Sequence, residues 1–319
     1  MKALIAIDGS NESADAVGVA CGLHWPEGSS VQLLHVIPTD LELSGGPLAG
    51  TYSVPSLDEV RGRLVEEGHE ILEHAIGRLE AAAVEVGAEM LEGRAATVIL
   101  ERAAKMEADL IVVGSRGLGA IGRMLLGSVS AELVDRAQAA VLVARRPGCR
   151  RILIGTDGSE DGTSAVRFVA ETGLFTGTET RVVHAIDLHP VWWTGFPPGA
   201  AAMSNDASLA VTLAARERGH AVTEDACKLL RSAGLATSWV VREEPAAQGI
   251  ANEAASWDAD LIVVGTRGHG LLKRMVLGST ARWLAHRAET SVLVTRPVPV
   301  RPATSGASSA ATSAHPIAV

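Results

Sequence analysis

The sequence predicts an α/β protein of two tandem doubly wound units, each a five-stranded parallel sheet flanked by helices. Strand-like apolar runs alternate with helix-like segments along the chain, which is the pattern of a parallel sheet with crossover helices. A glycine-rich stretch occurs twice, as LIVVGSRGLGAIGRMLLGSVS from Leu110 to Ser130 and as LIVVGTRGHGLLKRMVLGSTA from Leu261 to Ala281. LIAIDGS and LIGTDGS also recur at matching places, so whole domains are duplicated.

The element order is readable in the first unit. β-branched apolar runs predict strands, and apolar residues spaced along one face predict amphipathic helices. We expect strands at 2–8, 31–37, 88–91, 110–114 and 140–144, and helices at 10–23, 57–86, 96–106 and 130–139. The predicted domains are 1–147 and 148–299, followed by a disordered tail at 300–319 that consists mostly of Ala, Ser, Thr and Pro.

The composition excludes several classes of protein. Of the 319 residues 47% are apolar, yet no apolar run reaches the length of about 18 residues that a membrane helix needs. The net charge of −9 opposes binding to nucleic acid or to an anionic membrane surface. Three cysteines without paired spacing argue against disulfides and zinc, and Cys149 is expected to be at most an exposed thiol. With no export signal at the start, we expect a cytoplasmic protein.

The glycines of the repeated stretch suit a phosphate. Glycine lets the main chain turn sharply beside a bulky anion, and the helix that follows offers free N–H groups and a positive dipole end. Ser128 and Ser279 are expected to cap these helices with their hydroxyls. Two further interpretations are possible for the glycines: a dinucleotide fingerprint at Gly117, Gly119 and Gly122, and a purely structural role in strand-to-helix packing. The fingerprint fails in the second copy, where Lys273 replaces the third glycine, and a Walker A loop is absent.

Polar residues follow other strands in both units. Asp8 and Asp157 come at the carboxyl end of a first strand, where ligands bind in open parallel sheets, so they can meet a ribose or an adenine edge or merely cap the adjacent turn. His35 and His184 coincide between the copies. We interpret them as hydrogen-bonded structural residues rather than catalytic ones.

The spacing of glycine, two residues, glycine, nine residues, glycine and serine resembles the nucleotide-binding signature of the universal stress protein family. The last strands, AVLVARRP and SVLVTRP, match that family too. The resemblance implies ATP, with Mg²⁺ on its phosphates, the base against the main chain of Val36 and Ala185, and the triphosphate on N–H groups of 114–117 and 127–130. The expected ATP-binding residues are Ala6, Asp8, Val36, Gly114, Ser115, Arg116, Gly117, Gly119, Arg123, Gly127, Ser128, Val129, Ser130, Gly155, Asp157, Ala185, Gly265, Thr266, Arg267, Gly268, Gly270, Arg274, Gly278, Ser279 and Thr280.

The two sites are not identical. Ser130 corresponds to Ala281, so the second loop lacks a hydroxyl, although Thr280 stands where the first loop has Val129. Because a hydrogen bond to a charged group is worth about 1.5–3 kcal/mol, we expect weaker binding at the second site unless Thr280 replaces the contact.

The function that these features favour is ATP-dependent regulation in stress or growth adaptation, with little or no hydrolysis. The glycine loops contain no histidine except His269, which corresponds to Leu118. The alternatives are a slow ATP hydrolase or nucleotidyl-transferring enzyme, and a nucleotide-free dimerising scaffold. The resemblance also implies assembly through the last strands, either within one chain or as a homodimer. A second candidate contact surface is the aromatic segment from Trp192 to Phe196.

Overall fold

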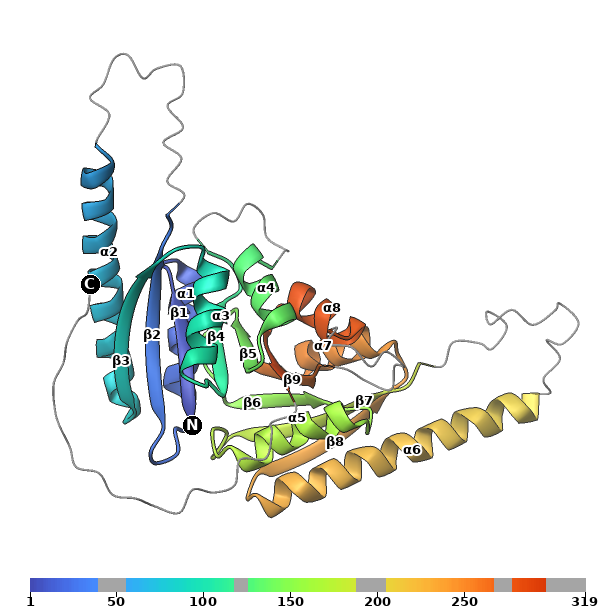
Figure 1. The fold of residues 1–319 in the computed structure, drawn as a ribbon. Coiled ribbons are helices and arrows are strands. Elements are labelled where there is room, and N and C mark those ends of the chain that lie inside the picture. Colours follow the sequence, from blue (N-terminus) through green and yellow to red (C-terminus); the bar gives the residue numbers. More distant parts are fainter. Residues whose placement is uncertain (40–55, 118–125, 188–204, 267–276, 297–319) are drawn as a thin grey trace, which may run out of the picture.

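The described residues form one continuous sheet of ten strands with helices on both faces (Figure 1). The computed structural model describes residues 1–39, 56–117, 126–187, 205–266 and 277–296. The first half contains β1 (Lys2–Ile7), α1 (Asn11–Gly22), β2 (Ser30–Ile37), α2 (Leu57–Leu79), the 3-10 turn η1 (Glu80–Ala82), β3 (Glu85–Glu92), α3 (Ala95–Lys105), β4 (Leu110–Gly114), α4 (Ser128–Arg136) and β5 (Ala140–Ala144). The second half contains β6 (Arg151–Gly155), α5 (Glu160–Glu171), β7 (Glu179–Ala185), α6 (Asn205–Ser232), β8 (Ala236–Arg242), α7 (Ala246–Ser256), β9 (Leu261–Gly265), α8 (Ser279–Arg287) and β10 (Ser291–Thr295).

The strand order is β3-β2-β1-β4-β5-β10-β9-β6-β7-β8. Within each half the neighbouring strands are parallel, and the chain order reverses between β1 and β4 and between β6 and β9. This confirms the predicted doubly wound topology. It also places the ends of β1 and β4 side by side at a point where such sheets bind ligands.

The two halves are joined through their last strands. β5 and β10 pair antiparallel, with Val143 opposite Val292 and Leu142 opposite Leu293. The expected pairing through the last strands therefore takes place within one chain. Since β5 also pairs with β4, and β10 with β9, neither strand keeps an edge for a homodimer, and that route is closed in this structure.

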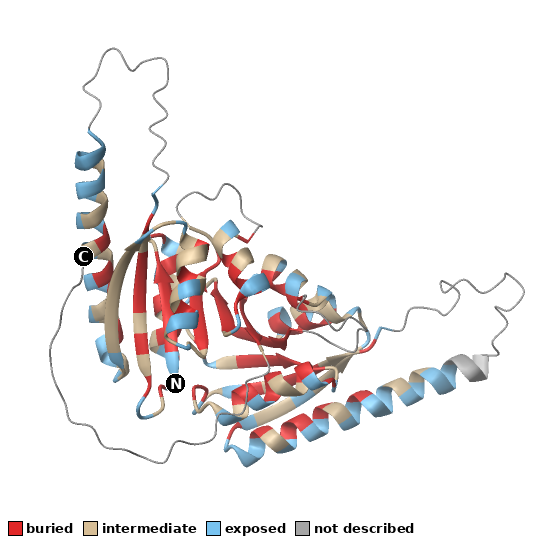
Figure 2. Cartoon of the chain, in the orientation of Figure 1, coloured by how far each residue is buried: buried red, intermediate tan, exposed pale blue. Residues whose placement is uncertain are grey.

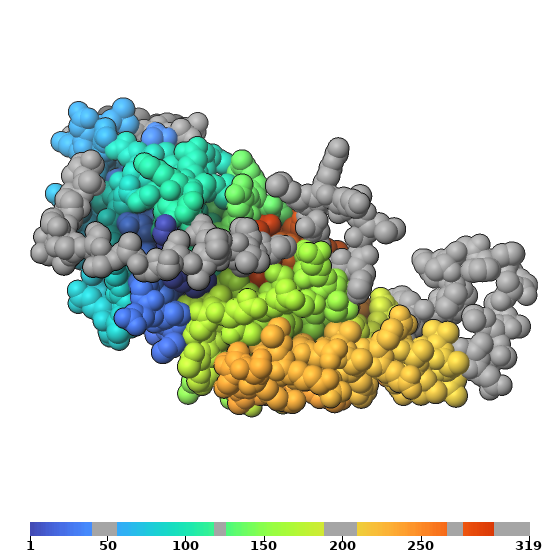
Figure 3. Space-filling model, turned by 60° about the horizontal axis from the view of Figure 1, so that its bottom comes forward, coloured from blue at the N-terminus to red at the C-terminus, as the bar shows by residue number. Residues whose placement is uncertain are grey.

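The core consists of two apolar layers, one on each face of the sheet. Side chains of α1, α2, α5 and α6 form one layer, and side chains of α3, α4, α7 and α8 form the other. All residues of the central strands β4, β5, β9 and β10 are buried, as expected for strands covered on both faces (Figure 2). The long helix α6 lies along the outside of the second half, beside β8 (Figure 3). None of the described helices combines the length and the apolar character needed to cross a bilayer.

One buried ion cluster stabilises the second half. The Glu253 side chain, 3% exposed, accepts hydrogen bonds from Arg181 Nη1 at 2.8 Å and from Arg242 Nε at 2.8 Å. The guanidinium of Arg181 also lies 4.6 Å from the ring centre of Trp257, in cation–π geometry. The carboxylate thus joins α7 to β7 and β8.

The structure corrects two expectations, one about a helix of the first half and one about a cysteine between the halves. The helix expected at 57–86 ends at Leu79, because Ala83 adopts a left-handed conformation with φ 53° and the chain then pairs with β2 from Glu85 onward. Cys149 is buried, at 2% exposure, rather than exposed. Burial, and then the negative charge of Asp260, raise the pKa of this thiol to about 12. The aromatic segment 192–196 and the tail 300–319 lie outside the described residues.

Candidate functional site

Each half has a glycine loop at the carboxyl edge of the sheet, where the strand order reverses. β1 and β4 are neighbours, with Ala6 opposite Val113, so Asp8 and Ser115 follow at the same edge. Gly114 lies tightly against α1, because an added Cβ would stand 2.6 Å from the main-chain oxygen of Glu12. At Gly265 the corresponding distance to the oxygen of Asp161 is 2.3 Å. The first glycine of each motif is therefore required by packing, as the structural interpretation holds.

A main-chain hydrogen bond closes each loop in the same way. Gly127 N donates to Ser115 O at 2.8 Å, and Gly278 N donates to Thr266 O at 2.7 Å. Gly127 and Gly278 are also the N-caps of α4 and α8, with extended φ/ψ of −61°/153° and −63°/154°. The prediction that Ser128 caps α4 with its hydroxyl, and Ser279 α8, is therefore wrong. A side chain at Gly127 would crowd Arg116, whose Cα lies 3.2 Å from the position of the added Cβ.

The first turn of each helix leaves N–H groups for an anion. In α4 the first helical bond is donated by Ala131 N to Gly127 O at 2.9 Å, so Ser128, Val129 and Ser130 have no intrahelical acceptor. In α8 the equivalent bond is donated by Arg282, which leaves the N–H groups of Ser279, Thr280 and Ala281. Ser128 and Ser279 are exposed. These donors, together with the positive end of the helix dipole, make both helix ends suited to phosphate oxygens.

The hydroxyl that distinguishes the two loops has a different role from the expected one. Ser130 is 2% exposed, and its Oγ donates to Gly114 O at 2.7 Å. The proton of this hydroxyl is thus used inside the loop, not offered to a phosphate. In the second half the corresponding residue is Ala281, also 2% exposed, which has no hydroxyl to make this bracing hydrogen bond.

Asp8 caps the turn before α1 and also reaches the first glycine loop. Its Oδ1 accepts from Ser10 N at 3.0 Å and from Ser10 Oγ at 2.5 Å, and Asp157 accepts from Ser159 at the same two distances. The turn-capping interpretation is correct for this oxygen. The other oxygen, Oδ2, lies 2.4 Å from where a Cβ on Gly117 would stand. Gly117 is therefore the residue that lets the loop approach the end of β1.

The sequence did not reveal the acidic partners of the loops. Arg116 Nη2 lies 2.7 Å from Glu12 Oε1, so its charge is directed to the start of α1. In the second half the equivalent carboxylate is Asp161, which accepts from Thr266 Oγ1 at 2.7 Å in a buried contact. The signal was present, since both copies carry an acidic residue at the same place after the first strand. Six expected site residues lie outside the described part of the chain: Gly119, Arg123, Arg267, Gly268, Gly270 and Arg274.

The residues expected near the base lie at the same edge. The pairing of β1 with β2 ends at Ile7 and His35, so the main chain of Val36 extends past β1. Val36 and Ala6 belong to the same apolar layer as α4. In the second half the pairing of β6 with β7 ends at Gly155 and Val183, and Ala185 likewise extends beyond it.

The two histidines near these strand ends hold the main chain. His35 Nδ1 is 3.0 Å from Ile7 O, and His184 Nδ1 is 2.9 Å from Thr156 O. Each histidine therefore ties a second strand to the end of the adjacent first strand. The structural interpretation of both is confirmed.

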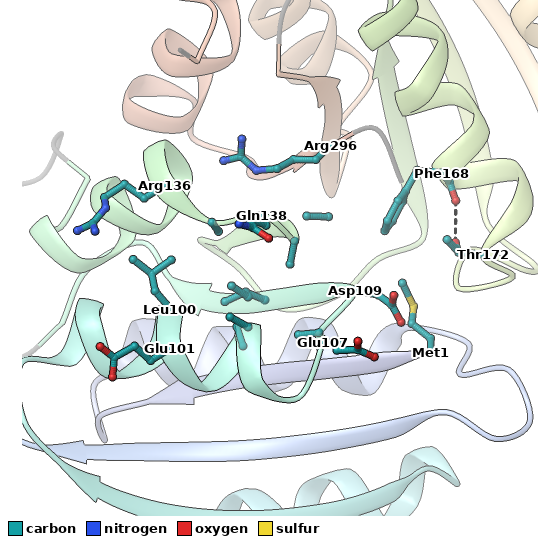
Figure 4. Close-up of a pocket in the computed structure, with 17 residues that line it drawn as sticks. Met1, Leu100, Glu101, Glu107, Asp109, Arg136, Gln138, Phe168, Thr172 and Arg296 are labelled. Atoms are coloured by element: carbon teal, nitrogen blue, oxygen red, sulfur yellow. Dashed lines mark hydrogen bonds between the residues drawn. The ribbon is translucent and has the colours of Figure 1, made fainter. Parts of the chain in front are cut away.

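Two cavities among the described residues lie away from the starts of α4 and α8. One, of about 560 Å³, lies between α1 and α2 and is lined by Asp8, Ser13, Ile71 and Arg78. Asp8 thus stands between this cavity and the glycine loop. The other, of about 840 Å³, lies where the two halves meet, and it is lined by Asp109 before β4, Phe168 of α5 and Arg296 after β10 (Figure 4).

The fold and the site define a tandem pair of α/β domains, each with a glycine loop and an acidic residue at its switch point. The model of the universal stress protein family matches residues 1–145 and 148–296. The chain belongs to the universal stress protein family.

Known proteins are similar to this chain over most or part of its length. A universal stress protein of Mycolicibacterium smegmatis is 30% identical over 304 residues, which cover 92% of this chain and 96% of that protein. The crystal structure of a universal stress protein from Archaeoglobus fulgidus is 19% identical and covers 93% of this chain and 98% of that one, with a TM-score of 0.60. A crystal structure of a universal stress protein in complex with cAMP covers 45% of this chain and 96% of that one at 24% identity, with a TM-score of 0.35.

Proposed function

We propose that this chain binds ATP at both glycine loops and acts as a nucleotide-dependent regulatory module in the cytoplasm. The observation that carries the proposal is the repeated loop: in each half one main-chain bond closes the loop, and the first three N–H groups of the following helix have no intrahelical acceptor. Both copies have this geometry, and the serine at each helix start is exposed, so it does not fill the core. An anionic ligand accounts for that position.

The surrounding residues fit an adenine nucleotide. The main chain of Val36 and Ala185 extends past the adjacent first strand and can hold the base, while Asp8 and Asp157 follow that first strand at the same edge. Mg²⁺ would be carried by the phosphates, because the described residues contain no cluster of His, Cys, Asp or Glu that could hold a metal ion. The chain would supply the N–H groups and the metal would screen the phosphate charge.

Bound ATP is proposed to act as a ligand with little or no turnover. The charged groups beside the first loop already have partners: Asp8 binds Ser10, and Arg116 binds Glu12. His35 is engaged with a main-chain carbonyl. No group among these is set to activate a water molecule, so the nucleotide would shift conformation or assembly rather than be consumed.

The test is a calorimetric titration of the full chain with Mg-ATP. Its variants carry proline at the first residue of α4 or α8, which we call the loop helices because each follows a glycine loop. Proline is accepted there because its ring fits the helix start, and the preceding glycine has the extended conformation that a residue before proline requires. Ser128→Pro and Ser279→Pro each remove one N–H donor. We expect two ATP per wild-type chain, and a loss of roughly tenfold or more at one site in each variant, because a hydrogen bond to a charged group is removed.

Leu57→Pro is the matched control. Leu57 is the first residue of α2, follows an extended N-cap at Ser56, and belongs to neither glycine loop. This substitution should leave both affinities unchanged. Failure of the wild-type chain to bind Mg-ATP at millimolar concentration would favour the nucleotide-free scaffold, and rapid release of ADP would favour the hydrolase.

A further inference from the structure

Each half sends an arginine from the end of its last strand to the loop helix of the other half. Arg145 follows β5, and its Nη2 donates to the main-chain oxygen of Ala285 in α8. Arg296 follows β10, and its Nη2 donates to the main-chain oxygen of Val134 in α4 at 2.6 Å. In Figure 4 the guanidinium of Arg296 points toward α4, whose last residue, Arg136, is labelled. The two contacts are equivalent under the duplication, and we call Arg145 and Arg296 the crossed arginines.

The crossed arginines bind carbonyls that the helices themselves leave without a donor. In α4 the last capping bond is donated by Ala137 N to Leu133 O at 2.9 Å, so the next carbonyl, that of Val134, has no intrahelical partner. The same holds for Ala285 in α8. A guanidinium supplies both the missing donor and a positive charge at the negative end of the helix dipole. Each arginine therefore fixes the far end of the opposite loop helix.

The loop helices α4 and α8 are short, and each begins at a glycine loop. α4 and α8 have nine residues each, which corresponds to a length of about 13 Å. The near end of α4 presents the N–H groups of Ser128 to Ser130 to the first site, and its far end is held by Arg296 of the second half. Any displacement of β10 therefore reaches the first site through one rigid element, and a displacement of β5 reaches the second site through α8.

Arg145 is also connected to the glycine loop of its own half. Ser115 N donates to the main-chain oxygen of Ala144, the residue before Arg145, at 2.8 Å. Burial, and then the positive charge of Arg116, lower the pKa of Arg145 to about 10, so it stays charged at neutral pH.

We propose that Arg145 and Arg296 are positioning residues that couple the two nucleotide sites, so that ATP at one loop raises the affinity of the other. The inference rests on the proposed function. ATP at one loop restricts the motion of the helix and last strand of that half. The crossed arginine, bonded to the helix of the other half, then restricts that helix too. The N–H groups of that helix therefore lose less conformational entropy when they bind the second ATP. By linkage the effect is the same in both directions.

The experiment is a Mg-ATP titration of the full chain with intrinsic affinities taken from single-site variants. Ser279→Pro weakens the second site and Ser128→Pro weakens the first, each by roughly tenfold or more, so one site fills while the other is still largely empty. The coupling factor is the ratio of affinities at one site with the other site filled and empty. We expect a factor of about five or more for the wild type, within the usual range for coupled sites. In Arg145→Gln and in Arg296→Gln it should fall to within about twofold of one.

Arg146→Gln is the matched control. Arg146 is also partly buried and donates to Ala259 O at 3.1 Å and to Thr290 Oγ1 at 3.0 Å, but these contacts do not hold α4 or α8. It should keep the wild-type coupling factor, and a merely structural weakening would lower both affinities without changing that factor. Independent sites in the wild type, or a factor that survives both crossed-arginine substitutions, would overturn the coupling and leave ATP binding standing. A wild-type chain that binds no Mg-ATP would overturn both proposals.

Discussion

Substitution of Gly117 by alanine tests whether Asp8 and the first glycine loop are in direct contact. The added Cβ would lie 2.4 Å from Asp8 Oδ2, so the carboxylate must move by roughly 1 Å to reach an ordinary contact distance. The backbone conformation does not oppose the substitution, because Gly117 does not have a positive φ.

The magnitude follows from what holds Asp8 in place. Its other oxygen accepts two hydrogen bonds from Ser10, and turning the carboxylate away from Gly117 weakens both. Hydrogen bonds to a charged group contribute about 1.5–3 kcal/mol each when fully formed. Since Asp8 is only partly buried and the bonds are weakened rather than removed, we expect Gly117→Ala to lower the free energy of unfolding by about 1.5 kcal/mol. Asp8→Ala should cost about 2 kcal/mol, and the double substitution hardly more than that.

The assay is urea unfolding of the wild type, both single variants and the double variant, followed by far-UV circular dichroism. The expected interaction energy between the two positions is about 1 kcal/mol or more. Gly77→Ala is the control, because a Cβ there meets nothing within 4 Å on the exposed face of α2, and it should stabilise by about 1 kcal/mol. Costs at Gly117 and Asp8 that add within about 0.5 kcal/mol would refute the contact between the loop and β1.

Three further outcomes are expected. Ser130→Ala should lower the free energy of unfolding by about 1 kcal/mol and lower the ATP affinity of the first site toward that of the second. Ala281→Ser should raise the free energy of unfolding and raise the ATP affinity of the second site toward that of the first. Unchanged affinities in calorimetry of the single-site variants would contradict the role of the hydrogen bond from Ser130 to Gly114. Cys149 should resist iodoacetamide at pH 8 in the native protein and react in urea, as mass spectrometry would show. Because its folded pKa of about 12 lies above the ordinary value, its contribution to stability is present below pH 9 and is lost as pH rises toward 12. Glu253→Ala should lower the free energy of unfolding by about 3 kcal/mol, since it leaves two adjacent guanidinium groups without their shared carboxylate, and a urea midpoint equal to the wild type's would refute this.

Most of the secondary structure follows from local pattern. The apolar runs of β4 and β9 and the helical periodicity of α3 predict elements within one residue of the observed bounds. The error at 57–86 has a physical cause, because helical spacing of apolar residues continues past Leu79 while the pairing of β3 with β2 begins at Glu85. Strand pairing is a long-range interaction, so the residue at which β3 begins depends on its partner β2 and not on the local pattern alone.

The candidate site was predictable to a similar degree. The glycine spacing and the positions of Asp8 and Asp157 indicate the edge of the sheet where the loops lie. The capping residue was not predictable, since Ser128 is a better capping residue than Gly127 by composition. Only the closeness of Arg116 to Gly127 in space shows why glycine occupies that position.

By itself the sequence determined that this protein is a duplication of one α/β unit with a glycine loop after the fourth strand of each copy. Those features depend on residues near one another in the chain, whose conformational preferences and periodicity are legible without a structure. Only the tertiary structure decided that β5 pairs with β10 in one chain, that Glu12 faces Arg116, and that Arg145 and Arg296 cross between the halves. These contacts join residues far apart in sequence, and their geometry depends on how the packed layers bring the two halves together.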